Sequence, residues 1–380
     1  MRARHSVHSL PAFPVYAAAF LADHSLVIGG GGGTSKSGIK NKLRLYTVDN
    51  ERSIALVDEF ELQSGEDAPM SMTADAESKT IFCGINSAQE VLEKGENQNC
   101  RVFTVHDTKI MLAKTQGTLP TDNAEDYQKI TVLSPDRAAL AIAGRHNLSV
   151  LSPTTLMPIA EPIQTDKEIY DAAFSESTFV VLTTHNLFVY AMTSQETGKD
   201  ISLELKKTIG IPDTIKSAGN CTFRATRFHP GQKCLFTVIN CVSPRSKETR
   251  NPSRQSFMCR WDTDTWTLEK HRKVGDRGLT CFDISPDGRF LALGSSDLSI
   301  GLLDPNTLIP IVTILKAHEF PPTTIKFNPA STLLVTGSAD NSIRVVNVPQ
   351  RPGGPAWIVI LIILTILVAL LAFGFERHFN

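Results

Sequence analysis

The sequence predicts an all-β chain, a β-propeller of seven blades followed by one C-terminal transmembrane helix. Three observations lead to this prediction: short alternating apolar segments typical of strands, turn motifs that recur about every forty to sixty residues, and an uncharged apolar run near the C-terminal end. The 380 residues are 42% hydrophobic and carry a formal net charge of -1, so no basic field argues for a nucleic-acid partner.

The clearest repeat unit runs from Thr280 to Asp304, and a second unit follows from Thr324 to Asn347. Each reads as three short strands separated by turns rich in Pro, Asp, Asn, Gly and Ser. Weaker turn motifs of the same kind lie upstream, at 20–23, 72–75, 132–136, 174–176 and 228–231. The seven motifs together predict seven blades. Residues His5 to Leu10 are expected to supply the outer strand of the last blade and so close the ring.

The last two units resemble WD repeats. Both contain a Gly-Ser-(Ser or Ala)-Asp turn, and His318 lies where such blades place a histidine, so we expect it to be a packing residue.

The run from Trp357 to Phe375 contains no charged residue and is long enough, at about 1.5 Å per residue, to cross a thin bilayer. Only Glu376 to Asn380 follow it, so we expect late insertion that leaves the preceding chain in the cytosol. The domains expected are a cytosolic propeller over 1–348 with a glycine-rich loop at 29–42, a Pro/Gly linker over 349–356, a transmembrane helix over 357–375 and a short lumenal tail over 376–380.

The seven cysteines are scattered, form no CxxC pair and are odd in number. Free, mostly buried thiols in a reducing compartment are the simplest interpretation. The chain also shows no Ser/His/Asp, Cys/His or paired-carboxylate pattern, which argues against a propeller hydrolase.

Five consecutive glycines, from Gly29 to Gly33, end a predicted strand, and another strand follows from Leu43. A nucleotide-binding P-loop is excluded because Ser35 precedes Lys36 where the motif needs glycine, and because no helix follows. Two interpretations remain, a flexible surface loop and a folded loop that binds a ligand. Contiguous glycines let carbonyls turn inward, and a ring of carbonyls with an Asn side-chain oxygen suits a hard monovalent cation.

The run Gly30 to Gly33, followed by Gly38-Ile39-Lys40-Asn41-Lys42-Leu43, resembles the potassium-binding loop of one family of exchange factors. These are the endoplasmic-reticulum membrane guanine-nucleotide exchange factors for the small GTPase of coat protein complex II, called in animals prolactin regulatory element-binding protein. The resemblance extends along the chain, through 14–16, 123–127, 317–318 and the final apolar run.

The resemblance implies that the loop folds around a potassium ion, with backbone carbonyls of Gly31, Gly32 and Gly33 and the side chain of Asn41 as ligands. Gly38, Ile39 and Asn41 would form the part that contacts the GTPase, displaces its magnesium and weakens GDP binding. No covalent step is required, because such a factor stabilises the nucleotide-free state of its partner.

Lys36, Lys40 and Lys42 are open to two interpretations, as solvated charges or as partner contacts. For the whole chain, the alternative function is a non-catalytic, membrane-tethered propeller scaffold, since a propeller fold does not by itself set a function.

Overall fold

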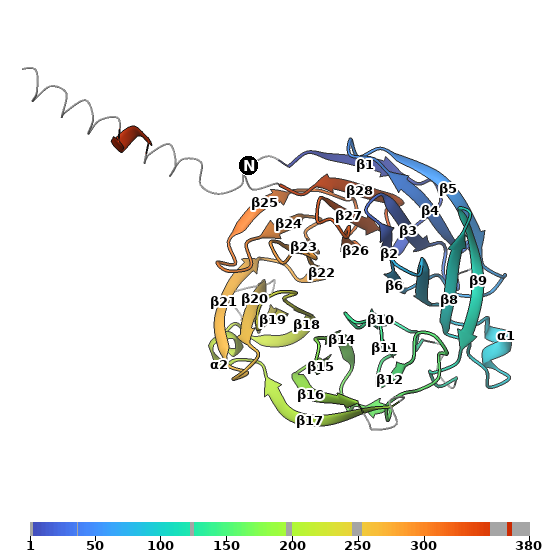
Figure 1. Cartoon of the computed structure of the whole chain (residues 1–380), viewed down its shortest axis with the longest axis horizontal. Helices are drawn as coiled ribbons and strands as arrows, with labels where there is room; N and C mark the ends of the chain where they lie inside the picture. The colour runs from blue at the N-terminus through green and yellow to red at the C-terminus, as the bar shows by residue number, and fades with distance from the viewer. Residues whose placement is uncertain are drawn as a thin grey trace, which may run out of the picture. The chain divides into compact units, whose positions relative to one another are not determined.

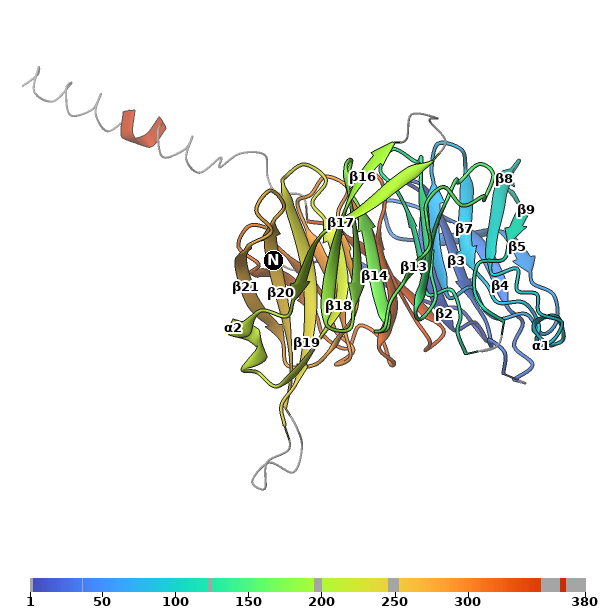
Figure 2. The same cartoon turned by 90° about the horizontal axis from the view of Figure 1, so that it is seen from below.

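The computed structural model describes residues 3–35, 37–121, 125–194, 200–244, 253–349 and 363–366. The chain divides into two compact units, Met1–Asn347 and Val348–Asn380. In the first unit, seven four-stranded antiparallel sheets are arranged around a central axis, seen along the axis in Figure 1 and from the side in Figure 2. This unit is therefore an all-β, seven-bladed propeller, as the turn motifs predicted.

The sheets follow the chain in order, each from an inner to an outer strand. The first two blades are β2 (Val15–Ala22), β3 (Ser25–Gly30), β4 (Lys42–Val48), β5 (Ile54–Glu61) and β6 (Ser71–Asp75), β7 (Thr80–Gly84), β8 (Cys100–His106), β9 (Lys109–Gln116). The next two are β10 (Ile130–Leu133), β11 (Leu140–Ala143), β12 (Asn147–Leu151), β13 (Ile163–Gln164) and β14 (Ile169–Phe174), β15 (Thr178–Thr183), β16 (Asn186–Ser194), β17 (Ile201–Gly210). The fifth and sixth are β18 (Asn220–Phe228), β19 (Cys234–Val242), β20 (Arg254–Asp262), β21 (Leu268–Gly275) and β22 (Leu279–Ile284), β23 (Leu291–Ser295), β24 (Ile300–Leu303), β25 (Pro310–Ile314). Two short helices, α1 (Gln89–Leu92) and α2 (Asp213–Lys216), lie in connections between strands.

The N-terminal strand closes the ring. The seventh blade consists of β26 (Pro322–Phe327), β27 (Leu333–Ser338), β28 (Ser342–Asn347) and, as its outer strand, β1 (His5–Ser9). β1 pairs antiparallel with β28, with His5 opposite Val346 and Ser9 opposite Ser342. The predicted closure by residues 5–10 is confirmed, and it joins the two ends of the propeller through backbone hydrogen bonds.

The hydrophobic core lies between neighbouring blades, because both faces of each sheet are covered. One cluster joins the seventh blade to the first through fully buried residues such as Ile28, Val335 and Ile343. Another joins the fourth blade to the fifth through Leu182, Phe223 and Ile239. Each blade is thus stabilised by burial against its neighbours, which holds the loops at either end of the ring in fixed positions.

His318 is a packing residue of the last blade, as expected. Its side chain is 5% exposed. Nδ1 lies 2.9 Å from Ser342 Oγ and Nε2 lies 2.8 Å from Thr336 Oγ1, so the ring links the connection before β26 to the second and third strands of the blade.

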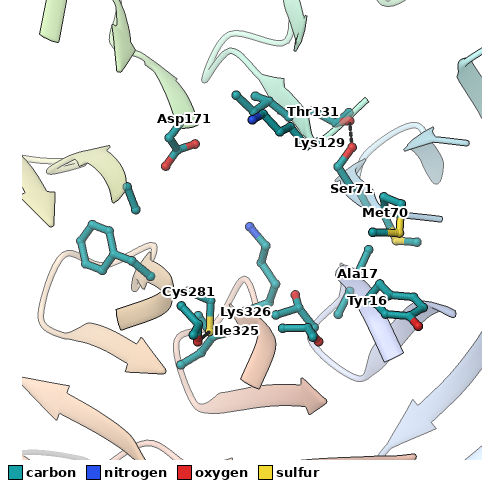
Figure 3. A pocket seen from close by; sticks show the side chains of 18 of the residues that line it. Tyr16, Ala17, Met70, Ser71, Lys129, Thr131, Asp171, Cys281, Ile325 and Lys326 are labelled. Carbon is teal, nitrogen blue, oxygen red and sulfur yellow. Dashed lines mark hydrogen bonds between the residues drawn. The ribbon is translucent and has the colours of Figure 1, made fainter. Parts of the chain in front are cut away.

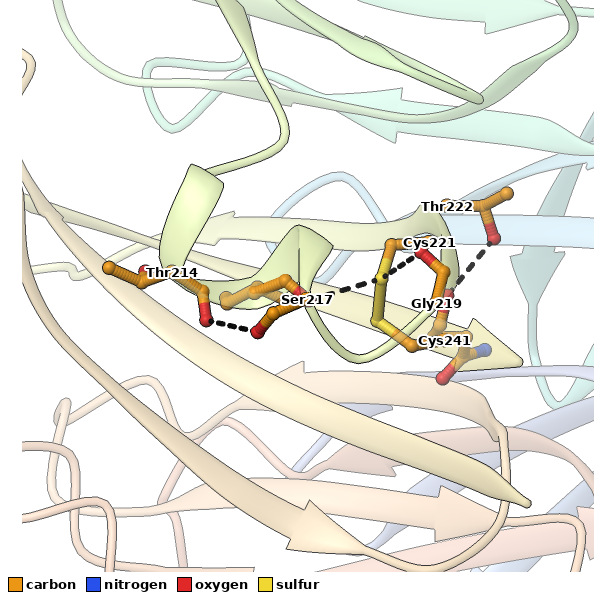
Figure 4. Close-up of a disulfide and its surroundings, with 8 residues drawn as sticks. Thr214, Ser217, Gly219, Cys221, Thr222 and Cys241 are labelled. Carbon is orange, nitrogen blue, oxygen red and sulfur yellow. Dashed lines mark hydrogen bonds between the residues drawn. A yellow bond between two sulfur atoms is a disulfide. The ribbon is translucent and has the colours of Figure 1, made fainter. Parts of the chain in front are cut away.

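Cys221 and Cys241 form a disulfide, and the interpretation that the cysteines are free is wrong for this pair (Figure 4). The two residues lie opposite each other on the neighbouring strands β18 and β19, with a Cα–Cα distance of 4.0 Å. The two cysteines are 20 residues apart in the sequence, and no motif marks them as a bonded pair. The other five cysteines are free thiols: Cys83, Cys100, Cys234, Cys259 and Cys281.

Because of the disulfide, the sulfur atoms of Cys221 and Cys241 should be protected from alkylation. When the chain is denatured with an alkylating reagent and no reductant, we expect five cysteines to be labelled, with Cys221 and Cys241 labelled only after reduction. Mass spectrometry of the peptides that contain the two residues measures this directly. Labelling of both without reductant would show that the protein carries the pair as thiols.

The predicted transmembrane helix at 357–375 lies, except for 363–366, outside the described residues, as do residues 350–356 of the linker and the tail at 376–380. Residues 363–366 are helical. Within the part of the chain that the structure describes, no helix is long and apolar enough to cross a membrane. The transmembrane segment therefore stays a prediction.

Candidate functional site

The glycine-rich segment forms a long hairpin connection in the first blade. β3 ends at Gly30, which lies opposite Lys42, the first residue of β4. Residues 31–41, here called the glycine loop, protrude between these two positions. The amide of Gly31 donates a hydrogen bond of 2.9 Å to the carbonyl of Pro14, just before β2 begins. The base of the loop is therefore attached to the end of the propeller at which the inner strands begin, here called the loop face.

Asn41 closes the base of the glycine loop with its side-chain amide. Its Oδ1 accepts a hydrogen bond of 2.8 Å from the backbone amide of Gly33, and its Nδ2 donates one of 2.9 Å to the carbonyl of the same residue. Nδ2 also donates to the carbonyl of Glu66 at 2.7 Å. The residue is 9% exposed. A single side chain, at the residue before β4, therefore joins the loop to the segment that follows β5.

Glycine is required where oxygen atoms crowd the start of the loop. Gly31 has φ of 138°, and a Cβ placed on it would lie 2.3 Å from Asn41 Oδ1 and 2.6 Å from the carbonyl oxygen of Lys40. A Cβ on Gly32 would lie 2.3 Å from Ser37 Oγ and 2.9 Å from the carbonyl oxygen of Ile39. Side-chain amide, hydroxyl and backbone carbonyl oxygens therefore converge on space that only glycine leaves open.

This donor set fits a hard monovalent cation. Potassium takes oxygen ligands, and the oxygens around Gly31 and Gly32 are neutral amide, carbonyl and hydroxyl atoms. The carbonyl of Gly32 accepts a hydrogen bond from Ser35 Oγ at 2.5 Å and that of Gly33 accepts one from Asn41, which leaves each a second lone pair. Among the described residues, no cluster of three or more His, Cys, Asp or Glu could hold a metal ion, so an acidic site does not compete.

The tip of the loop is presented to solvent. Gly38 is exposed, has φ of 76°, and has no atom within 4 Å of the position that a Cβ would take. Ile39 is half-buried beside it. Lys40 forms an ion pair of 3.0 Å with Glu61, and Lys42 is paired with Glu59, so both are neutralised within the first blade. Lys36 lies outside the described residues.

An acidic side chain that no sequence motif predicted lies beside the glycine loop. A Cβ on Gly33 would lie 3.3 Å from Asp67 Oδ1. Burial raises the pKa of Asp67, although a hydrogen bond from the Ala68 amide to its Oδ1 at 2.7 Å opposes the shift. Burial also raises the pKa of Tyr16 and of Tyr127, and the charge of Asp67 adds to both shifts. Asp67 therefore connects the loop to two tyrosines near the propeller axis.

A second unpredicted feature is a ring of β-bulges at the loop face. Five inner strands each contain one extra, unpaired residue near their start, which shifts the register against the neighbouring strand. These strands are β2, β14, β18, β22 and β26. In the other two blades the residue before the inner strand takes the same position, since Met70 N donates to Gly84 O and Lys129 N to Ala143 O. The bulge ring consists of Tyr16, Met70, Lys129, Tyr170, Arg224, Thr280 and Thr323.

The bulge ring surrounds the mouth of the central channel. All seven residues line a cavity of about 450 Å³ that Tyr127 and Glu168 also border. They also line the narrower channel beneath it, of about 170 Å³ (Figure 3). A bulge re-aims the side chain of its extra residue, so each blade directs one residue into the opening.

Two segments of the chain, residues 263–304 and 310–347, match the WD domain, G-beta repeat. The Raptor protein of Chaetomium thermophilum has the same fold, with a TM-score of 0.67 at 12% identity over 92% of this chain and 29% of Raptor. The fold is therefore a seven-bladed propeller with WD40 repeats in its last blades.

Two relatives of this chain are named as guanine nucleotide-exchange factors. Guanine nucleotide-exchange factor SEC12 of Candida glabrata is 25% identical over 89% of this chain and 71% of its own length. Guanine nucleotide-exchange factor SEC12 of Rattus norvegicus is 22% identical over 95% of this chain and 96% of its own. The chain is a homologue of the SEC12 guanine nucleotide-exchange factors, and the resemblance inferred from the glycine loop is confirmed.

Proposed function

We propose that this chain releases GDP from the small GTPase that initiates coat protein complex II assembly, and that the glycine loop, ordered by potassium, is its active element. The observation that carries the proposal is the Asn41-closed loop, whose neutral oxygens converge around Gly31 and Gly32 on the loop face. The homology to SEC12 exchange factors supports the same activity. Attachment to the endoplasmic reticulum through 357–375, with the propeller in the cytosol, completes the proposal.

The loop residues have distinct tasks in this mechanism. Asn41 and the carbonyls of Gly31, Gly32 and Gly33 would hold the ion, and the positive charge of the ion would offset the repulsion among these oxygens. Asn41 also fixes the loop to Glu66. The exposed tip at Gly38 and Ile39 is then rigid when it meets the partner.

Rigidity matters because exchange depends on binding the nucleotide-free GTPase better than the GDP-bound form. A tip that is already ordered loses little conformational entropy when it enters the nucleotide pocket, so more of its binding energy acts against GDP. Gly38 and Ile39 would contact the phosphate-binding and switch regions, where magnesium and GDP are otherwise held. No proton transfer or covalent bond is needed from this chain.

The direct test uses the full chain purified in detergent with potassium present. The GTPase is loaded with a fluorescent GDP, and release is followed after excess GTP is added. We expect release to be accelerated at least about tenfold over the uncatalysed rate, equivalent to about 1.4 kcal/mol of transition-state stabilisation. If a folded chain gives no acceleration, a membrane-tethered scaffold is the better interpretation.

Replacing Asp67 with asparagine is expected to slow exchange and to raise the unfolding midpoint at neutral pH. Burial raises the pKa of Asp67, so the folded state binds the proton more tightly than the unfolded state does. Above the folded pKa the buried carboxylate is charged and destabilises the fold; below the unfolded pKa both states are protonated and the effect vanishes. Asparagine removes this charge, and with it the negative field beside Gly33 that favours a bound cation.

Thermal unfolding as a function of pH checks the sign. The stability advantage of Asp67→Asn over the wild type should be present at neutral pH and should disappear as the pH falls through the folded and then the unfolded pKa. Asp264→Asn is the matched control. Asp264 lies on the connection between β20 and β21, is exposed, and forms an ion pair with Lys233. A loss of stability at neutral pH in Asp67→Asn would contradict the assignment of a buried, unfavourable charge.

A further inference from the structure

Within the described part of the chain, the central channel contains basic side chains that form no ion pair. Two members of the bulge ring, Lys129 and Arg224, are basic. Lys129 Nζ forms an ion pair of 2.5 Å with Glu168 Oε1. Arg224 instead donates from Nη2 to the carbonyl of Thr280 at 2.6 Å, and its guanidinium lies 5.8 Å from the ring centroid of Tyr170. Within the described ranges, the structure shows no ion pair for Arg224.

A further cation lies deeper. Lys326, on the inner strand β26 of the seventh blade, extends into the open centre of the channel (Figure 3). In the same part of the channel, Arg227 is held by Asp171 at 2.6 Å and Asp283 at 3.7 Å, so both nearby carboxylates are already engaged. For Lys326, the described part of the chain shows no ion pair. The channel therefore contains two basic side chains, those of Arg224 and Lys326, for which the described residues show no ion pair.

Like charges in a narrow channel repel each other more strongly than they would in bulk water, because the surrounding protein screens them poorly. Burial is the main cause that lowers the pKa of Lys129, and the positive charge of Arg224 makes a smaller contribution in the same direction, while Glu168 and Asp126 oppose both. An anion that reached both Arg224 and Lys326 would relieve this repulsion.

The mouth above these cations is aromatic and polar. Tyr16 and Tyr170 of the bulge ring, together with Tyr127, border the wider cavity of about 450 Å³. The channel beneath, of about 170 Å³, has room for a few non-hydrogen atoms but not for a folded segment. The recess therefore accommodates a compact charged group below and a larger, partly apolar body against the tyrosine rings above.

We propose that the central channel binds a small phosphate-bearing anion from the loop face, with Arg224 and Lys326 as the phosphate-binding residues and the tyrosines of the mouth contacting the rest of the molecule. A guanidinium matches the geometry of phosphate oxygens, and an ammonium supplies a second point charge. The inference depends on the closed ring and its bulges, not on the exchange activity, so it stands or falls separately from the proposed function.

The test measures phosphate binding to the full chain in detergent at physiological ionic strength by isothermal titration calorimetry. One arm uses sodium pyrophosphate, and the other uses a water-soluble dibutanoyl phosphatidylinositol 4-phosphate. We expect saturable binding of one equivalent, weakened at least about tenfold by Lys326→Met and by Arg224→Gln. Binding in the pyrophosphate arm alone identifies a free phosphate; tighter binding in the lipid arm identifies a headgroup.

Lys233→Met is the matched control, because Lys233 is exposed and forms an ion pair with Asp264 away from the channel. The affinity of this variant for both probes should equal that of the wild type. Thermal unfolding of each variant verifies that the propeller is intact. The proposal is overturned if neither probe binds, or if Lys326→Met and Arg224→Gln both bind as tightly as the wild type. It is also overturned if a polyglutamate peptide binds more tightly than either probe and loses affinity in the same variants, because the channel would then serve a protein partner.

Discussion

Asn41→Ala is expected to reduce catalysed GDP release at least about tenfold while the propeller stays folded. The side chain makes three hydrogen bonds that no alanine can replace, to both backbone groups of Gly33 and to the carbonyl of Glu66. It also supplies one of the oxygens around Gly31. Its loss would free the base of the glycine loop and remove an ion ligand together.

The Asn41→Ala variant is also expected to lose some stability. Truncation leaves the buried carbonyl of Glu66 without its donor, which costs about 1–3 kcal/mol. We therefore expect the unfolding midpoint to fall by a few degrees. The amide of Leu62 still donates to the backbone carbonyl of Asn41 at 2.9 Å, so β4 and β5 should remain paired beside the loop.

The cation distinguishes loss of the ion site from loss of contact with the GTPase. Exchange by the wild type should slow when lithium replaces potassium, because lithium is too small for a site built from several carbonyls. Asn41→Ala should be slow in both salts. If the wild type were indifferent to the cation, the loop would act without an ordering ion, and the exchange activity itself would still stand.

The blades could be predicted because their signals are local. A turn such as Ser285 to Gly288 is encoded by its own residues, and the strands on either side are short, largely apolar runs typical of a buried sheet. Seven such turns determined the blade count, and the leftover strand at His5 could only pair with the open edge of the last blade. The glycine loop was recognisable for the same reason, since five glycines in succession are visible in the sequence alone.

The features that were missed depend on residues far apart in the chain. Cys221 meets Cys241 only because β18 and β19 pair in one register, and a shift of one residue would separate them. Asp67 reaches Gly33 because the segment after β5 folds back beneath the loop. The bulge ring has no sequence signature, since tyrosine, methionine, lysine, arginine and threonine occupy equivalent positions, and only the backbone register identifies them.

Gly31→Ala tests the oxygen-lined site without removing any ligand. The added methyl group would lie 2.3 Å from Asn41 Oδ1 and 2.6 Å from the Lys40 carbonyl oxygen, both shorter than any van der Waals contact, and φ of 138° is a conformation that alanine rarely adopts. Either the loop base or the end of β3 must shift. We expect exchange to fall at least about tenfold and to lose its dependence on potassium, with backbone strain of about 1–3 kcal/mol lowering the unfolding midpoint.

Gly231→Ala provides the matched control, because a Cβ on Gly231, in the turn between β18 and β19, meets nothing within 4 Å. Exchange and its potassium dependence should be unchanged in that variant. Gly38→Ala separates the two roles of the loop further. A Cβ on Gly38 meets no atom within 4 Å, but φ of 76° strains an alanine there, so the change acts on the exposed tip and leaves the oxygens around Gly31 in place. Any loss of exchange should then persist equally in potassium and lithium as a defect of the tip. If Gly31→Ala instead retained full, potassium-dependent exchange, the oxygens around Gly31 would not form the ion site, and the ordering of the loop would have to come from Asn41 alone.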